Sequence, residues 1–139
     1  DLGKIDNDEK LWQELAKSSN LPILILERLA KDEDYVVRKN IAKNSITPIS
    51  ILKQLVGDRS FSVRSTAAAN PNISRSLMQK ILLCKDSSAS AGLAENPNTP
   101  TKILKQLAVD KAKYVRQKVA QHPYTPAKIL VRLAKDENE

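Results

Sequence analysis

The chain has 139 residues, about one domain, and its 41% hydrophobic and 28% charged residues are typical of a folded protein rather than a disordered tail. One cysteine, Cys84, and one histidine, His122, exclude an internal disulfide, a cysteine-ligated cluster and a zinc site built from several such ligands. With so few nucleophiles, bases and ligands, we expect no enzyme, no cofactor, no metal and no small-molecule substrate. The longest apolar run, residues 21–26, is too short to cross a membrane, and no signal-peptide pattern is present, so we expect a cytoplasmic protein without membrane contact.

The net charge of +7 is unevenly distributed along the chain. Residues 1–34 carry 5 basic and 9 acidic side chains, whereas residues 35–134 carry 17 basic and 4 acidic ones. Such a basic body attracts polyanions or acidic protein surfaces. Lysine and arginine also keep helix surfaces soluble without any anionic partner, so the charge alone does not choose between these possibilities.

Residues 1–21 are predicted to form a degenerate capping helix. Apolar residues lie there at helical spacing: Leu11, Trp12, Leu15 and Ala16. Terminal repeats need a polar outer face, and we expect Trp12 to plug the core of this cap rather than to stack on a ligand.

Residues 22–139 repeat with a period of 26 residues and need no insertion. Four full units start at Pro22, Pro48, Ser74 and Pro100, and a partial fifth unit starts at Pro126. The clearest apolar column reads Leu29, Leu55, Ile81, Leu107 and Leu133. A small-residue column reads Ala42, Ala68, Ala94 and Ala120. One unit cannot bury its own apolar face, so stacked units are expected to form an all-α solenoid.

Each unit is predicted to contain two short helices and no strand. The first helix follows Thr-Pro, as at Thr47-Pro48, where threonine would cap the helix and proline would take its first position. The second helix is expected to begin near Asp34, Ser60 or Asp86 and to end at Asn-Pro. Because 26 residues leave little room, the second helix should have about two turns and be partly 3₁₀.

The segments LAKDEDYVVRKNIAKNSITPISILKQL (29–55) and LAVDKAKYVRQKVAQHPYTPAKILVRL (107–133) resemble the bacterial leucine-rich repeat variant family. That resemblance covers residues 22–139 and implies alternating α- and 3₁₀-helices in a right-handed superhelix without strands. Some family members carry a four-cysteine iron–sulfur module, but this chain has only Cys84, so no redox role follows. The family shares no enzymatic activity, and it implies at most macromolecular binding.

Two single residues are given structural roles. His122 stands in the column of Asn44, Asn70 and Asn96, where we expect a polar group at a helix end that satisfies turn amides. Cys84 stands in an aspartate column and is expected to be a small, half-buried apolar residue.

A candidate partner surface lies on the exposed face of the second helices, whose columns are small at the centre and basic at the ends. Its predicted residues are Lys39, Lys43, Ser62, Ser65, Lys113, Gln117 and Lys118. Small residues such as Gly92 at the centre would let the backbone or helix of a partner come close. The alternative interpretation is an ordinary solvated face.

A recurring aspartate and arginine, six residues apart, predict a structural ladder inside the solenoid, which bridges the end of the first helix and the second helix within a unit or to its neighbour. The pairs are Asp32 and Arg38, Asp58 and Arg64, and Asp110 and Arg116. The third unit has Cys84 and Ser90 at these two positions, and losing both together is what a paired interaction predicts.

These features favour a non-catalytic scaffold that binds proteins, preferably acidic ones. The alternative is a nucleic-acid-binding module held by phosphate contacts, although the chain has only five aromatic residues for base stacking. An enzyme such as a helical-repeat DNA glycosylase ranks third, because residues 35–134 hold only four acids. The acidic end at residues 136–139 is compatible with a natural stop or with a fragment of a longer array.

Overall fold

The computed structural model describes residues 9–136, so parts of the predicted cap and of the last unit, residues 1–8 and 137–139, lie outside the described residues. The prediction of an all-α chain is confirmed, because residues 9–136 form helices and no strand. The helices are α1 (Glu9–Leu15), α2 (Ile23–Leu29), α3 (Tyr35–Lys43), α4 (Ile49–Leu55), α5 (Phe61–Ala68), α6 (Arg75–Cys84), α7 (Ser87–Glu95), α8 (Thr101–Leu107), α9 (Lys113–Gln121) and α10 (Ala127–Asp136).

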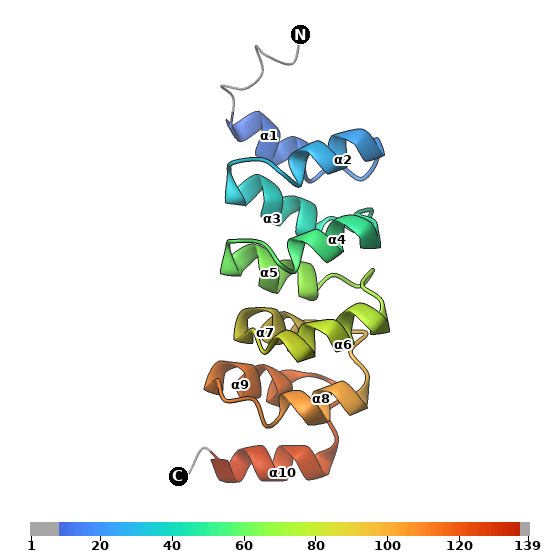
Figure 1. The fold of residues 1–139 in the computed structure, drawn as a ribbon. Helices are drawn as coiled ribbons and strands as arrows, with labels where there is room; N and C mark the ends of the chain where they lie inside the picture. The colour runs from blue at the N-terminus through green and yellow to red at the C-terminus, as the bar shows by residue number, and fades with distance from the viewer. Residues whose placement is uncertain (1–8, 137–139) are drawn as a thin grey trace.

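The helices stack in pairs along one direction, with the N-terminal end of the described chain at the top of Figure 1 and the C-terminal end at the bottom. Helices α3, α5, α7 and α9 contact one another in succession along one side, and α2, α4, α6 and α8 follow the other side. We use "second helices" for α3, α5, α7 and α9, and "first helices" for α2, α4, α6, α8 and α10. The first helices begin at Ile23, Ile49, Arg75, Thr101 and Ala127, each 26 residues after the previous one.

The second helices have the expected length of about two turns, but the expectation that they are shorter than the first helices is wrong for three of the four full units. The second helices have 8 or 9 residues, whereas the first helices α2, α4 and α8 have only 7. No 3₁₀-helix lies in residues 9–136, and the tightening occurs instead just after the first helices. After α4, for example, the amides of Gly57 and Asp58 donate to carbonyls three residues earlier, at 3.1 Å each. The second helices also end in a bond of this kind, for example from the Asn70 amide to the Ala67 carbonyl at 3.1 Å, so both helices of a unit are α-helical with a tightened end.

Threonine does not cap the first helices as predicted. Pro48 is itself the N-cap of α4, with an extended backbone (φ −72°, ψ 160°) and no side-chain cap. The Thr47 hydroxyl instead donates to the Ile41 carbonyl at 2.6 Å, near the end of the preceding second helix. Thr99 and Thr125 make the same bond. A helix C-terminus leaves carbonyls without intrahelical donors, so a buried hydroxyl is more useful there.

The hydrophobic core runs through the whole stack and includes the predicted leucine column and, except for Ala120, the predicted alanine column. In the second unit the first helix contributes Ile51, Leu52 and Leu55, all buried, and the second helix contributes the buried Val63 and Ala67. Fully burying one such large aliphatic side chain stabilises a fold by about 1.5–3 kcal/mol. No helix in the described range is long and apolar enough to cross a membrane.

The closest packing lies between α5 and α7, and a glycine permits it. A Cβ built on Gly92 would lie 2.1 Å from the Ser65 carbonyl oxygen and 2.8 Å from the Ala68 Cβ. Both distances are far below van der Waals contact, so only glycine fits at position 92. The small residues predicted to admit a partner helix therefore admit a helix of this same chain, and the buried Ala91 and Gly92 are not available as a docking floor.

Candidate functional site

A buried column of asparagines joins each unit to the one before it. The Asn70 Nδ2 donates to the carbonyls of Ala42 and Asn44, at 2.8 and 3.0 Å, and its Oδ1 accepts the Asn72 amide. The same three contacts recur at Asn44 and Asn96. These buried bonds fix the register between units, because leaving any of them unmade would cost about 1–3 kcal/mol.

His122 continues this column and has the structural role that the sequence predicts. Its Nδ1 accepts the Tyr124 amide at 3.1 Å, and its Nε2 lies 2.9 Å from the Asn96 carbonyl oxygen. Because an amide must donate and a carbonyl must accept, the ring is neutral with its proton on Nε2. Both ring nitrogens are thus engaged in structural bonds.

The arginine column forms ion pairs between neighbouring units. The Arg38 Nε and Nη2 donate to the two carboxylate oxygens of Asp58, at 2.8 and 3.0 Å, and both side chains are nearly buried, at 5% and 9% exposure. The Arg38 Nη1 donates to the carbonyls of Asp32 and Glu33. Arg38 therefore meets its own unit through backbone oxygens and the next unit through a carboxylate.

Charge and burial act in opposite directions on this pair. Burial alone would raise the pKa of Asp58, but the hydrogen bonds from Arg38 and from the Ser60 amide outweigh it and hold that pKa below its ordinary value. The hydrogen bond to Asp58 raises the pKa of Arg38 against the opposing effect of burial.

The other two arginines form ion pairs that are either poorly aligned or long. The Arg64 Nε lies 2.6 Å from an Asp86 carboxylate oxygen without being aligned as a hydrogen bond, and the Arg116 Nε lies 3.8 Å from Asp136. We expected Cys84 and Ser90 to replace the two partners of one ion pair. That expectation is wrong, because the two positions belong to different pairs. Because Arg38 and Arg116 pair with the residue 20 positions later, position 84 corresponds to the partner of Arg64 and position 90 corresponds to the partner of Asp110.

Three of the predicted partner-binding residues lie together in one groove. Lys39 and Lys43 of α3 and Ser65 of α5 line a cavity of about 450 Å³ that also includes Thr66 and Glu95. Both lysines are exposed, and Ser65 is half-buried. The lining of the groove thus combines two exposed lysines of α3 with two hydroxyl side chains of α5 and with Glu95.

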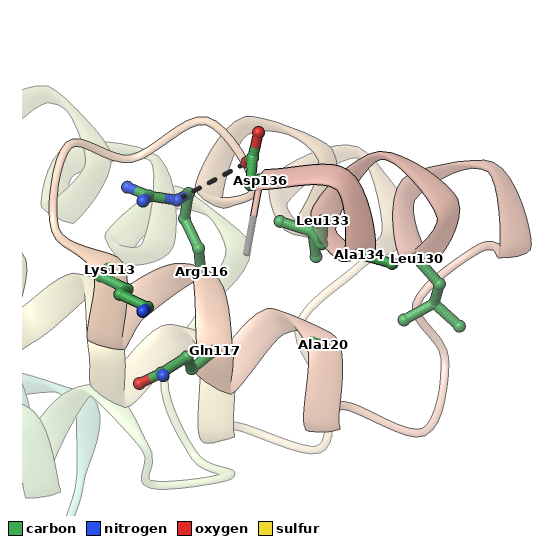
Figure 2. Close-up of a pocket in the computed structure, with 8 residues that line it drawn as sticks. All are labelled: Lys113, Arg116, Gln117, Ala120, Leu130, Leu133, Ala134 and Asp136. Carbon is green, nitrogen blue, oxygen red and sulfur yellow. Dashed lines mark ion pairs between the residues drawn. The ribbon is translucent and has the colours of Figure 1, made fainter. Parts of the chain in front are cut away.

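Two other predicted residues, Lys113 and Gln117, lie in a separate cleft at the C-terminal end. Figure 2 shows this cleft of about 430 Å³ between α9 and α10, with the Arg116–Asp136 ion pair at one edge. Ala120 is exposed there, although Ala42, Ala68 and Ala94 in its column are buried. The difference arises because α9 has α10 as a neighbour here but no further second helix in the described chain.

The last two predicted residues are engaged within the chain. The Lys118 ammonium lies 2.7 Å from a Glu95 carboxylate oxygen. Ser62 is half-buried on α5, and its carbonyl accepts the Thr66 hydroxyl at 2.8 Å. The single surface that the columns predict is therefore divided between a groove and a cleft. Glu95 is not among the residues that the columns predict for that surface. Its exposed position next to the basic columns was the available signal.

Cys84 is exposed, so the expectation of a half-buried residue is wrong. Helix α6 is 10 residues long and ends at Cys84, and the next residue, Lys85, has a left-handed backbone (φ 53°). The longer helix carries Cys84 away from the turn that aspartate occupies in the other units. No group of three or more metal-binding side chains occurs within residues 9–136.

Trp12 is buried as predicted, and the guanidinium carbon of Arg28 lies 5.6 Å from its ring centre.

Comparisons with known protein families, with curated proteins and with solved structures found no match to this chain.

Proposed function

We propose that the protein is a non-catalytic scaffold that binds acidic segments of partner proteins along its second helices. The observation that carries the proposal is the groove between α3 and α5, in which the exposed Lys39 and Lys43 face Ser65 and Thr66. Neither lysine has an ion-pair partner among the described residues, in contrast to Lys118. Lysine ammonium groups and hydroxyls together can bind the carboxylates of an extended acidic peptide.

The proposal includes the architecture that would present this groove. We infer a right-handed solenoid of 26-residue helical units similar to the leucine-rich repeat variant family. Support comes from the constant spacing of helix starts and from the asparagine contacts that recur between successive units. Such a stack offers an extended face on which neighbouring units bind successive parts of one partner.

Charge complementarity would act mainly on the rate and selectivity of binding. The basic body attracts acidic partners over a distance of about one Debye length, roughly 8 Å at physiological salt. Exposed lysine–carboxylate pairs contribute little affinity each, about 0.2–1 kcal/mol, so several contacts along the groove are required.

Fluorescence titrations of the full chain with a labelled poly-glutamate peptide at several salt concentrations test the proposal. Lys39→Glu with Lys43→Glu should abolish binding, because the double change reverses the charge of the groove. Lys53→Glu with Lys105→Glu is the matched control, since it makes the same charge change on exposed positions of the first helices α4 and α8. Equal loss in both variants would mean attraction by net charge alone and would contradict the groove.

The competing function is phosphate-mediated binding of nucleic acid, which the exposed lysines also favour. Duplex DNA and single-stranded RNA serve as additional probes in the same titrations. A steep salt dependence with nucleic acid, together with weaker binding of the acidic peptide, would replace the protein-binding proposal with this one.

A further inference from the structure

The paired arginines define a position that recurs along the chain. Arg38 and Arg116 each approach a carboxylate 20 residues later, Asp58 or Asp136. We use "rung" for an arginine position together with the carboxylate position 20 residues after it. By the 26-residue period, rungs begin at positions 12, 38, 64, 90 and 116.

The rung at positions 90 and 110 has its carboxylate but not its arginine. Ser90 stands at the arginine position and is buried on α7. The Asp110 Oδ1 accepts the Ala112 amide at 2.8 Å, just as the Asp58 Oδ1 accepts the Ser60 amide at 2.8 Å. The backbone therefore orients both carboxylates in the same way. Asp110 has no ion-pair partner in the part of the chain that the structure describes.

In the other two irregular rungs, a residue that carries the missing charge lies close by. At position 84, where cysteine replaces aspartate, Asp86 supplies the carboxylate for Arg64. At position 12, where tryptophan replaces arginine, Arg28 lies over the indole ring. At the rung with Ser90, Arg116 donates to the backbone carbonyl of Asp110, but no described cation pairs with the Asp110 carboxylate.

A cavity of about 420 Å³ lies at this rung. Ser90 and Asp110 line it, together with Gln79, Leu82, Leu83 and Val109. Leu83 and Val109 are 80% and 66% exposed, which is unusually high for large aliphatic side chains. The cavity thus combines an oriented carboxylate and an amide with apolar walls, which suits a charged group on an aliphatic stem.

We propose that this cavity binds a guanidinium group from outside the chain, namely an arginine side chain. The chain itself provides the precedent, since Arg38 binds Asp58 through Nε and Nη2 in a two-bond fork. A planar fork matches a carboxylate better than the single point charge of a lysine ammonium, so arginine is preferred over lysine. The apolar walls would contact the three methylene groups of the arginine.

Two lysines, Lys85 and Lys111, also line the cavity and oppose the entry of a cation. Arg38 lies in comparable surroundings, because it and the Arg59 guanidinium both donate to the Glu33 carbonyl. Flanking cations therefore lower the affinity without excluding a guanidinium group. For one exposed ion pair with apolar contacts, we expect a dissociation constant on the order of millimolar.

The test uses three capped tripeptides that differ only at the central residue: arginine, its neutral isostere citrulline, or lysine. Each is titrated into the isotopically labelled full chain, and amide chemical shifts are followed by NMR. The arginine peptide should shift the amides around Ser90, Asp110 and Ala112, and citrulline should bind about tenfold more weakly or not at all. Equal shifts with arginine and citrulline would overturn the proposal.

Two variants locate the site. Asp110→Asn keeps the oxygen that accepts the Ala112 amide but removes the charge, so binding should weaken about tenfold or more. Glu27→Gln, an exposed change on α2, is the matched control and should leave binding unchanged. Ser90→Arg would place an internal guanidinium in the cavity, and it should abolish peptide binding and raise Tm by a few degrees, roughly 2–6 °C. Unchanged binding in Asp110→Asn would contradict the site, whether or not Ser90→Arg folds.

Free L-arginine is the final probe, because the same chemistry could come from the amino acid or from a protein. Tighter binding of the tripeptide than of free arginine would identify a protein segment as the source. The reverse order would identify a small-molecule ligand. Absence of shifts at Asp110 with both probes, up to tens of millimolar, would overturn the proposal. None of these outcomes depends on the α3–α5 groove, so the two proposals fail separately.

Discussion

Two contacts between neighbouring units are built differently: the rung between Arg38 and Asp58, and the packing of the third unit, α6–α7, on the second. At the rung, a forked ion pair with two nearly buried partners joins neighbouring units. The third unit has Cys84 and Ser90 at the two polar positions, and its helix α7 packs tightly on α5 through Gly92 beside the less well aligned Arg64–Asp86 ion pair. Charge and close backbone packing therefore contribute in different proportions to the contacts between units, and the following predictions separate the two.

The largest effect is expected where the packing is closest. Gly92→Val should destabilise the fold by more than about 4 kcal/mol, because its side chain would overlap the Ser65 carbonyl and force α5 and α7 apart. Urea unfolding followed by circular dichroism measures the change. The control is Gly57→Ala at an exposed position, where the added Cβ would lie 3.5 Å from the Gln54 carbonyl oxygen and stability should change by less than about 1 kcal/mol. A mild effect of Gly92→Val would contradict the close packing.

The buried ion pair should rank next. Arg38→Met leaves the Asp58 carboxylate buried without its cation and should cost about 3–5 kcal/mol in urea unfolding. Adding Asp58→Leu should recover part of that loss, because removing both charges avoids an uncompensated one. Additive losses in the double variant would show that the two side chains act independently.

The same pair predicts how stability depends on pH. Because the folded state lowers the pKa of Asp58, the unfolded state binds more protons in the acidic range, and stability falls as pH falls. The contribution is complete above the unfolded pKa, about 4, and is lost as pH drops through the lower folded pKa. Urea titrations between about pH 6 and 2 should show the advantage of the wild type over Asp58→Asn shrinking below about pH 4. A constant difference between the two proteins would contradict this origin of the stability.

The sequence predicts the helices far better than the side-chain partners. The leucine and alanine columns place all the described first and second helices, because the periodicity marks the face of each helix that is turned toward the core, although Ala120 at the end of the described stack is exposed. Arginine spacing, however, does not reveal whether a long side chain reaches back or forward along the stack. Six residues separate Asp58 from Arg64, yet the Asp58 carboxylate binds Arg38. Arg64 contacts Asp58 only at its backbone carbonyl.

The small residues of α7 illustrate the same limit. Glycine within a helix indicates a close approach, and that much can be read from the sequence. Which surface approaches depends on the rotation of α7 about its axis, and here it is α5. Likewise, the exposure of Cys84 follows from the extra length of α6, which no capping residue in the sequence indicates.

The smallest effect is expected at the C-terminal rung, where charge contributes least. Asp136 is 45% exposed, and its carboxylate lies 3.8 Å from the Arg116 Nε, so solvent and salt screen the pair. Asp136 also stands at the C-terminal end of α10, where the helix dipole disfavours an acid. Asp136→Asn should therefore change stability by less than about 0.5 kcal/mol, and the difference should vanish in high salt. Arg116 keeps its hydrogen bonds to the carbonyls of Asp110 and Lys111 in this variant, so the measurement isolates the carboxylate. A loss of unfolding free energy as large as that of Asp58→Asn would mean that the strength of these ion pairs does not depend on distance and exposure. The arginine column would then stabilise every unit equally.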